Sequence, residues 1–168
     1  MAESVAKVAR KVNEAVETGA QHLDLSSCAL NSFPTGLYFV MRSVSDKILS
    51  ISLANNELKT LGGTFFTTFT QLQELNLEGN LLEKLHAEIC NLPNLKSINL
   101  CRNKFATFPE ELIRIPSLET INLESNEITD IPVDELNSMP HLSSVNVQMN
   151  PINKDSLNQG NIKFELAM

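Results

Sequence analysis

The sequence predicts an α/β solenoid, a stack of short repeats with parallel strands along one face and helical segments along the other. One observation is a motif of the form L-x-x-L-x-L-x-x-N-x-L, which recurs at intervals of 23 or 24 residues. Another is an apolar run after each copy, of a length suited to a short helix. The copies are LQELNLEGNLL (72–82), LKSINLCRNKF (95–105), LETINLESNEI (118–128) and LSSVNVQMNPI (142–152).

The motif itself predicts a strand. In its first copy, apolar Leu75 and Leu77 alternate with polar Glu74, Asn76 and Glu78. Alternation with a period of two places the two sets on opposite faces of a strand. The apolar run that follows returns the chain to the next strand through a short α-helical or 3₁₀ segment. Since one repeat cannot bury its own inward face, the core forms only when neighbouring repeats stack.

An asparagine marks the turn that ends each motif. These residues recur at spacings of 24, 23, 23 and 24, and they are Asn56, Asn80, Asn103, Asn126 and Asn150. A chain that turns sharply off a strand leaves backbone N–H and C=O groups without partners, and an amide side chain can both donate to and accept from such groups. We therefore predict a buried ladder of asparagines with a structural role.

The motif and the ladder together resemble the leucine-rich repeat family. The resemblance covers residues 20–152 as six repeats, with departures in the first, where Ala20 replaces leucine and Cys28 replaces asparagine. It implies a horseshoe with short parallel strands on the concave side and helical or 3₁₀ segments on the convex side. It also implies a cytoplasmic interaction module without enzymatic activity. We expect residues 1–168 to form a single domain.

The N-terminal segment predicts an amphipathic helix over residues 4–18. Its apolar residues recur at steps of three or four, which places them on one helical face; they are Val5, Val8, Ala9, Val12 and Val16. This helix could bind a partner, but the first repeat of a solenoid exposes its core and needs a cover. We therefore favour a capping helix.

The C-terminal segment, residues 153–168, predicts a second cap. Ile162, Phe164 and Leu166 alternate with Lys163 and Glu165, as in a strand. A strand beside the sixth repeat would close the exposed sheet edge, which otherwise invites association between edges. Within the first repeat, the extra residues 41–47 predict a loop without a specific function.

Composition excludes several classes of function. The net charge of −7 argues against nucleic acids and anionic membranes, whose binding requires a surplus of Lys and Arg on some face. No stretch of 18 apolar residues is present, and the N-terminus does not resemble a signal peptide. Three widely spaced cysteines do not suggest a disulfide framework. We expect a cytoplasmic protein, with the nucleus as an alternative location.

No catalytic or metal-binding motif is apparent, so we predict no enzymatic activity, cofactor or metal. The three histidines, His22, His86 and His141, lie in different repeats and at different positions within them. The remaining chemical hypothesis concerns the Cys101 thiol, which the register places outward on the concave face. The carboxylates of its row neighbours Glu78 and Glu124 would raise its pKa and make it less reactive.

The leading functional hypothesis is a docking surface on the concave face. Its polar residues could simply keep the solenoid solvated, but their short hydrogen-bonding groups and acidic bias suit a protein or peptide with basic or amide-rich side chains. We expect a monomer with a weak or transient partner. The candidate contact residues are Glu74, Asn76, Glu78, Asn99, Cys101, Arg102, Asn122, Glu124, Asn146 and Gln148.

A second hypothesis is a structural or assembly role. Tyr38, Phe39, Phe65 and Ile113 exceed the number of inward positions on the return segments. Together they could form an apolar patch on the convex side, the kind of patch that marks an interface. The edge strands of the sheet are a further route to assembly.

Overall fold

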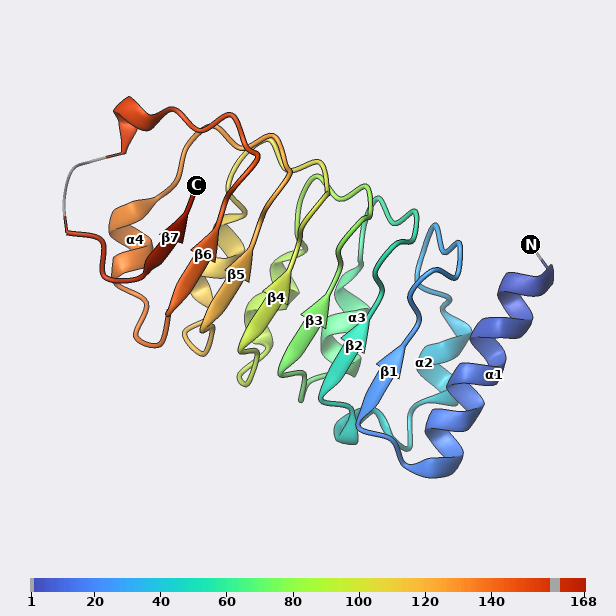
Figure 1. Ribbon diagram of the computed structural model, residues 1–168. Helices are drawn as coiled ribbons and strands as arrows, with labels where there is room; N and C mark the ends of the chain where they lie inside the picture. Colours follow the sequence, from blue (N-terminus) through green and yellow to red (C-terminus); the bar gives the residue numbers. More distant parts are fainter. Residues whose placement is uncertain (1, 158–160) are drawn as a thin grey trace.

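The computed structural model describes residues 2–157 and 161–168 and contains a seven-stranded parallel sheet. The strands follow one another in sequence order, and each pairs only with its neighbours, so the sheet is open and uncurled (Figure 1). Every strand has three residues: β1 (His22–Asp24), β2 (Ser50–Ser52), β3 (Glu74–Asn76), β4 (Ser97–Asn99), β5 (Thr120–Asn122), β6 (Ser144–Asn146) and β7 (Glu165–Ala167).

Short helices return the chain behind the sheet, so that strands and helices form two layers (Figure 1). The α-helices are α1 (Ala2–Thr18), α2 (Gly36–Val40), α3 (Gly63–Thr68) and α4 (Val133–Asn137). The 3₁₀ segments are η1 (Ser45–Lys47), η2 (Ala87–Asn91), η3 (Glu110–Arg114) and η4 (Lys154–Ser156). The predicted α/β solenoid is confirmed. The side chains that point away from the helices form the predicted concave face, called the sheet face below.

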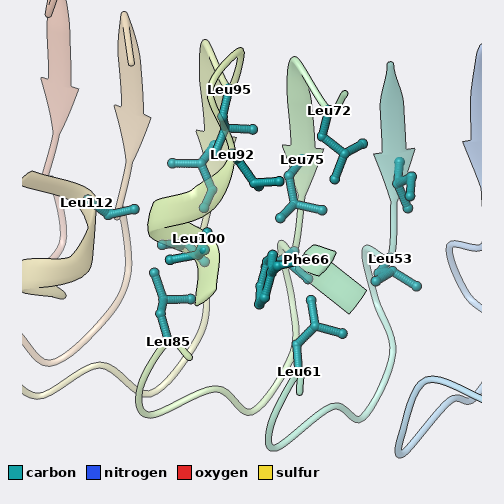
Figure 2. Packing of buried hydrophobic residues seen from close by; sticks show 14 of the residues in the cluster. Leu53, Leu61, Phe66, Leu72, Leu75, Leu85, Leu92, Leu95, Leu100 and Leu112 are labelled. Atoms are coloured by element: carbon teal, nitrogen blue, oxygen red, sulfur yellow. The ribbon is translucent and has the colours of Figure 1, made fainter. Parts of the chain in front are cut away.

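The core lies between the two layers and continues from Val8 to Phe164. The middle residue of each strand points into it, and the parallel register stacks Ile51, Leu75 and Ile98 in one column. Leucines and Phe66 from the return segments fill the space behind these strands (Figure 2). Burying each such side chain contributes roughly 1.5–3 kcal/mol, which offsets the cost of ordering the chain only when many repeats contribute.

Each turn off a strand needs one residue with a left-handed backbone. It lies directly before the ladder position, and the residues are Ser27, Asn55, Gly79, Arg102, Ser125 and Met149. Glycine is needed at only one of these turns. A Cβ atom on Gly79 would lie 2.5 Å from Asn55 Oδ1, so the side chain of Asn55 occupies the space that another residue type would require.

The asparagine ladder is present and fully hydrogen-bonded. Asn103 illustrates it: its Oδ1 accepts from the Leu82 N–H at 3.0 Å, and its Nδ2 donates to the carbonyls of Leu77 at 2.9 Å and Leu100 at 3.1 Å. Asn56, Asn80, Asn126 and Asn150 make the equivalent bonds in their own turns. These amides link adjacent repeats through backbone groups that would otherwise be buried without partners.

The irregular first repeat is joined to the same ladder. Cys28 is buried, and the backbone N–H groups of Cys28 and Leu30 donate to Asn56 Oδ1 at 3.0 and 2.9 Å, so the amide of the second repeat links the first repeat to the ladder. The extra residues 41–47 also have a structural role. Met41 and Val44 from this segment are buried in the core, so the insertion fills the wider space beneath the first repeat.

Candidate functional site

The sheet face presents the first and third residues of each strand and the residues that follow the strand ends. Register pairs Asn76 with Asn99, Asn99 with Asn122, and Asn122 with Asn146, so these four side chains form one adjacent file across β3 to β6. A shallow hollow of about 320 Å³ lies over β2, β3 and β4 and is lined by Ser50, Ser52, Glu74, Asn76, Ser97 and Asn99.

The file of asparagines is held in place by the backbone. In each case Oδ1 accepts a hydrogen bond from the N–H two residues later: Asn76 from Glu78, Asn99 from Cys101, Asn122 from Glu124 and Asn146 from Gln148, at 2.9–3.0 Å. Half of each amide is therefore used to shape the turn. The Nδ2 groups of Asn99 and Asn146 donate to glutamates on the same face, Glu78 and Glu124.

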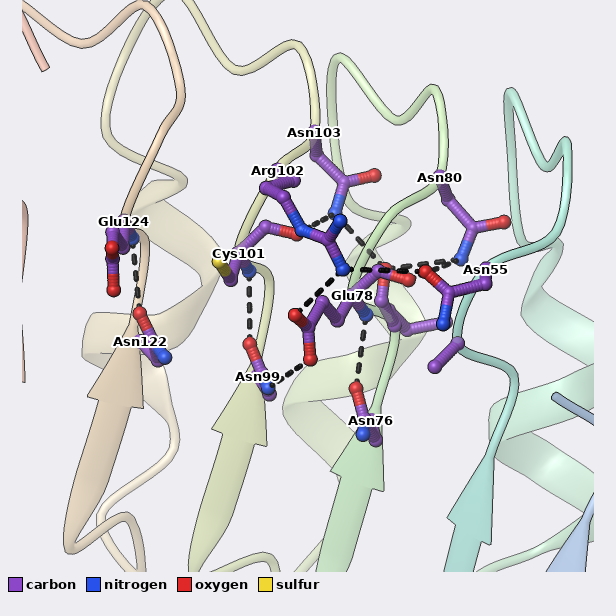
Figure 3. A network of polar contacts seen from close by, with 12 residues as sticks. Asn55, Asn76, Glu78, Asn80, Asn99, Cys101, Arg102, Asn103, Asn122 and Glu124 are labelled. Carbon is purple, nitrogen blue, oxygen red and sulfur yellow. Dashed lines mark hydrogen bonds and ion pairs between the residues drawn. The ribbon is translucent and has the colours of Figure 1, made fainter. Parts of the chain in front are cut away.

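Glu78 is the centre of a polar network (Figure 3). Its Oε1 lies 2.8 Å from Arg102 Nη2, and its Oε2 accepts from Asn99 Nδ2 at 3.2 Å. The same Arg102 nitrogen donates to Asn55 Oδ1 at 3.3 Å. The network joins three successive repeats on the sheet face. Because the ion pair is exposed to solvent, it contributes little to stability.

Glu124 lies two repeats further along, in the same row as Glu78 and Cys101. Its Oε2 accepts from Asn146 Nδ2 at 3.1 Å. Within residues 2–157 and 161–168, no Lys, Arg or His nitrogen forms an ion pair with it, whereas Glu78 has Arg102. The carboxylates of Glu78 and Glu124, which share a row, therefore differ in how far they are neutralised.

Comparison with known proteins supports the pattern described above. The family described as "Leucine rich repeat" matches residues 47–105 and 93–152, which together span more than half of the chain. The chain belongs to the leucine-rich repeat family. It is 58% identical over 170 residues to leucine-rich repeat-containing protein 20 of Mus musculus, with 100% of this chain and 92% of the relative covered. The Homo sapiens protein of the same name is 56% identical over the same shares.

Solved structures agree on the leucine-rich repeat fold. A leucine-rich repeat protein from Bacteroides thetaiotaomicron has a TM-score of 0.74 at 20% identity, covering 88% of this chain and 19% of that one. The TLR13–ssRNA13 complex gives a TM-score of 0.68 at 24% identity, covering 82% and 20%. The leucine-rich repeat domain of APL1B gives 0.65 at 21% identity, covering 84% and 39%. At these identities the likeness concerns the fold alone.

Cys101 is less exposed to solvent than its outward position in the repeat suggests. It points to the sheet face as predicted, but only 8% of its surface is exposed. Burial raises the pKa of its thiol, and the neighbouring Glu78 and Glu124 raise it further, while Arg102 opposes them. The predicted direction of the pKa shift therefore holds, but desolvation is the larger cause. A buried neutral thiol is a poor nucleophile.

The predicted convex patch is mostly absent. The prediction that Phe65 lies on the surface is wrong, because its side chain is fully buried, with 0% exposure. Its segment forms the α-helix α3, and the helical spacing directs it into a cluster where its ring lies 5.1 Å from both Phe33 and Phe69. Tyr38 and Ile113 are half-buried against the core. Only Phe39, 79% exposed, projects from the surface as predicted.

One contact between neighbouring repeats was not predicted from the sequence. Gly63 begins α3, and a Cβ atom there would lie 2.9 Å from Glu88 Cδ and 3.1 Å from His86 Cε1. Glu88 in turn forms an ion pair with His86 Nδ1. The glycine therefore allows this pair from the next repeat to approach the helix. The Gly62-Gly63 sequence was the available signal, although its partner was not apparent.

Within residues 2–157 and 161–168, no group of three or more His, Cys, Asp or Glu side chains could hold a metal ion. In the same residues, no helix combines the length and apolarity required to cross a membrane.

Proposed function

We propose that this leucine-rich repeat protein is a non-enzymatic interaction module that binds a segment of another protein on its sheet face. We further propose that residues 1–168 act as one domain, as a monomer inside the cell. The proposed contact residues are the ten named from the sequence, and three of them, Glu78, Asn99 and Arg102, share one polar network (Figure 3). The family to which the chain belongs supports an interaction role at the level of the fold.

The observation that carries this proposal is the fixed arrangement of polar side chains on an open sheet. The asparagine side chains are held by hydrogen bonds from their own turns before any partner arrives. Groups that are already ordered lose little conformational entropy on binding, so their interactions with a partner contribute more of their energy to affinity. The Nδ2 groups of Asn76 and Asn122 and the carboxylates offer donors and acceptors to an extended peptide.

The charge of this face favours a protein partner over a nucleic acid. The TLR13 structure contains ssRNA13, which shows that RNA occurs in a complex with one protein of similar fold. The present chain has a net charge of −7 and carries Glu74, Glu78 and Glu124 on the sheet face. Phosphate groups would be repelled from these carboxylates, since nucleic-acid binding depends on neutralising phosphates with Lys and Arg.

A comparison of two charge-reversed variants tests the proposal. The sheet-face variant combines Glu78→Lys with Glu124→Lys, and the matched control combines Glu83→Lys with Glu127→Lys, which are exposed and are not among the ten proposed contact residues. Both changes alter the net charge equally. Proteins captured from cell lysate by the wild type should be lost with the first variant and retained with the second. Equal retention by both variants would refute binding on the sheet face.

The same experiment tests the structural or assembly role. Phe39 and Val40 remain as exposed apolar residues on α2, and they support a smaller version of the convex interface. A Phe39→Ser variant should leave capture unchanged if the sheet face binds the partner. Loss of capture with Phe39→Ser, together with retention by the sheet-face variant, would favour the convex surface instead.

A further inference from the structure

Two positions on the sheet face share one backbone environment. The Gly79 N–H donates to the Cys101 carbonyl at 2.9 Å beside Glu78, and the Ser125 N–H donates to the Gln148 carbonyl at 2.9 Å beside Glu124. Each glutamate also accepts a hydrogen bond from the asparagine of the next strand, Glu78 at 3.2 Å and Glu124 at 3.1 Å. Glu78 and Glu124 are therefore equivalent positions in the third and fifth repeats.

The two positions differ in the residue that the next repeat supplies. Beside Glu78 this residue is Arg102, with φ 55°, and its guanidinium lies 2.8 Å from the carboxylate. The equivalent residue beside Glu124 is Met149, with φ 58°. Its side chain is 76% exposed, the second highest exposure among the large apolar residues described. The fifth repeat thus has the carboxylate and an apolar neighbour, but lacks the cation.

Arg102 is committed to Glu78 and does not neutralise Glu124. Its Nη2 atom is held by both Glu78 Oε1 and Asn55 Oδ1, and its side chain turns toward these residues and away from Glu124 (Figure 3). Among the ion pairs of residues 2–157 and 161–168, none involves Glu124. The carboxylate is therefore available to a cation from outside the chain.

We propose that Glu124 and Met149 together receive a lysine or arginine side chain of the partner, an inference that rests on the proposed function. Both side chains combine an aliphatic stem with a terminal cation. The cation would pair with Glu124 as Arg102 pairs with Glu78, while the stem would pack on the exposed, flexible Met149 side chain. The partner segment is thus identified by one basic residue that takes the place of the missing arginine.

A peptide titration tests this assignment on the full chain. The probe is the peptide acetyl-Gly-Gly-Arg-Gly-Gly-amide, and its control has Gln in place of Arg. With methyl-labelled methionine, the Met149 signal should shift saturably with the Arg peptide and remain unchanged with the Gln peptide. Replacing Glu124 by Gln should weaken the Arg-peptide affinity about fivefold, as expected for loss of one exposed ion pair. The matched control Glu83→Gln, at an exposed carboxylate that is not among the proposed contact residues, should retain wild-type affinity.

Exchanging the two neighbours gives a second and more specific test. In the wild type, the Arg peptide should also shift the backbone amide signal of Glu124. Met149→Arg should fill the site from within the chain and abolish this peptide-induced shift. The backbone should tolerate it, because Arg102 adopts the same conformation in its own turn. Arg102→Met should have the reverse effect and create a second peptide site at Glu78. The thermal unfolding of both variants checks that they remain folded.

Three outcomes would overturn the inference: equal shifts with the Gln peptide, an equal loss of affinity from Glu83→Gln and Glu124→Gln, or an unchanged site in a folded Met149→Arg variant. None of them would refute the proposed function, because lysate capture with the double charge reversal is a separate measurement. If that capture depends on the sheet face while the Arg peptide does not bind, the interaction role stands and the assignment of a basic residue to Glu124 and Met149 fails.

Discussion

The two ends of the solenoid are closed in different ways. At the N-terminal end, α1 lies across the first repeat and buries Val8, Val12 and Ala15 in the core. Its lysines also reach the sheet: Lys7 Nζ donates to the Ser27 carbonyl at 2.9 Å and Lys11 Nζ to the Asp24 carbonyl at 3.0 Å. One helix therefore covers the end of the core and satisfies carbonyls on the outer side of β1.

The C-terminal end is extended rather than covered. As predicted, a strand forms beside the sixth repeat, since β7 pairs in parallel with β6, and Phe164 is buried below it. The tail is fastened by Asn137, which donates to the Asn161 carbonyl at 3.0 Å and accepts from the Lys163 N–H at 2.8 Å. In the part of the chain that the structure describes, β7 has no strand on its other side. The prediction that this strand closes the edge is therefore incomplete.

This difference shows what each kind of cap can do. A helix satisfies its own backbone hydrogen bonds, so it can cover the end of a sheet without creating a new unpaired edge. An added strand covers one edge and presents another, which requires a second protective feature. The outer residues Lys163 and Glu165 are both exposed and charged, and charged edge residues are one such feature.

Deleting residues 162–168 should have the largest effect. The truncation removes β7 and Phe164 and leaves β6 as an unpaired edge over an open core. Light scattering with size-exclusion chromatography should show concentration-dependent association, with little monomer remaining. A soluble, monomeric truncation would mean that β7 is dispensable and that the sixth repeat closes the solenoid by itself.

Placing a charge under α1 should have the next largest effect. Val12 is 1% exposed, so Val12→Asp should destabilise the protein by about 3–5 kcal/mol, the cost of an uncompensated buried charge. Val5 lies on the same helix but is 69% exposed, and Val5→Asp should change stability by less than about 0.5 kcal/mol. Urea unfolding followed by circular dichroism measures both. Similar values for the two variants would contradict the capping role of α1.

The asparagine ladder should distinguish the middle of the stack from its C-terminal end. Asn103→Leu should destabilise by about 1–3 kcal/mol, because it leaves buried groups of Leu82, Leu77 and Leu100 without partners. Asn150 makes equivalent bonds but is only half-buried, so water can replace its amide, and Asn150→Leu should cost about 1 kcal/mol or less. Thermal unfolding of Asn103→Leu that matches the wild type would refute the buried ladder.

A small pH effect is expected at the N-terminal end. Hydrogen bonds from the Ser26 hydroxyl and backbone N–H, with smaller contributions from Lys11 and Lys7, lower the pKa of Asp24 below its ordinary value of 3.8. The stabilisation from the ionised Asp24 is therefore complete above pH 3.8. It disappears as the pH falls through the lower pKa that Asp24 has in the folded protein. Asp24→Asn should reduce the acid sensitivity of unfolding slightly, since the side chain is exposed. An unchanged acid transition would contradict this contribution.

Much of the fold could be predicted because the repeat is periodic. Alternation at Leu75 and Leu77, repeated at intervals of 23 or 24 residues, determines both the direction of each side chain and the stacking of strands. The same spacing located the asparagine ladder. The error at Phe65 has a local cause. An α-helix and a 3₁₀ segment point their side chains in different directions. The apolar run after the second motif did not show which of the two would form.

The candidate site was only partly predictable. The register correctly aligned Glu78, Cys101 and Glu124 on one row, but side-chain pairing depends on which rotamer each residue adopts among its neighbours. Arg102 could be assigned to the face from its position, whereas its commitment to Glu78 and Asn55 was not apparent. The burial of Cys101 likewise depends on these neighbours.

The amino-acid sequence by itself determined the repeat length, the inward leucines, the ladder and the polar composition of the sheet face. These properties follow from short-range periodicity, which is visible along the chain. Only the tertiary structure decided that Glu78 is neutralised from within and Glu124 is not, and that one end of the sheet is covered while the other is extended. These outcomes depend on contacts between residues that lie 20 or more positions apart, as with Lys7 and Ser27, and a local pattern does not specify them.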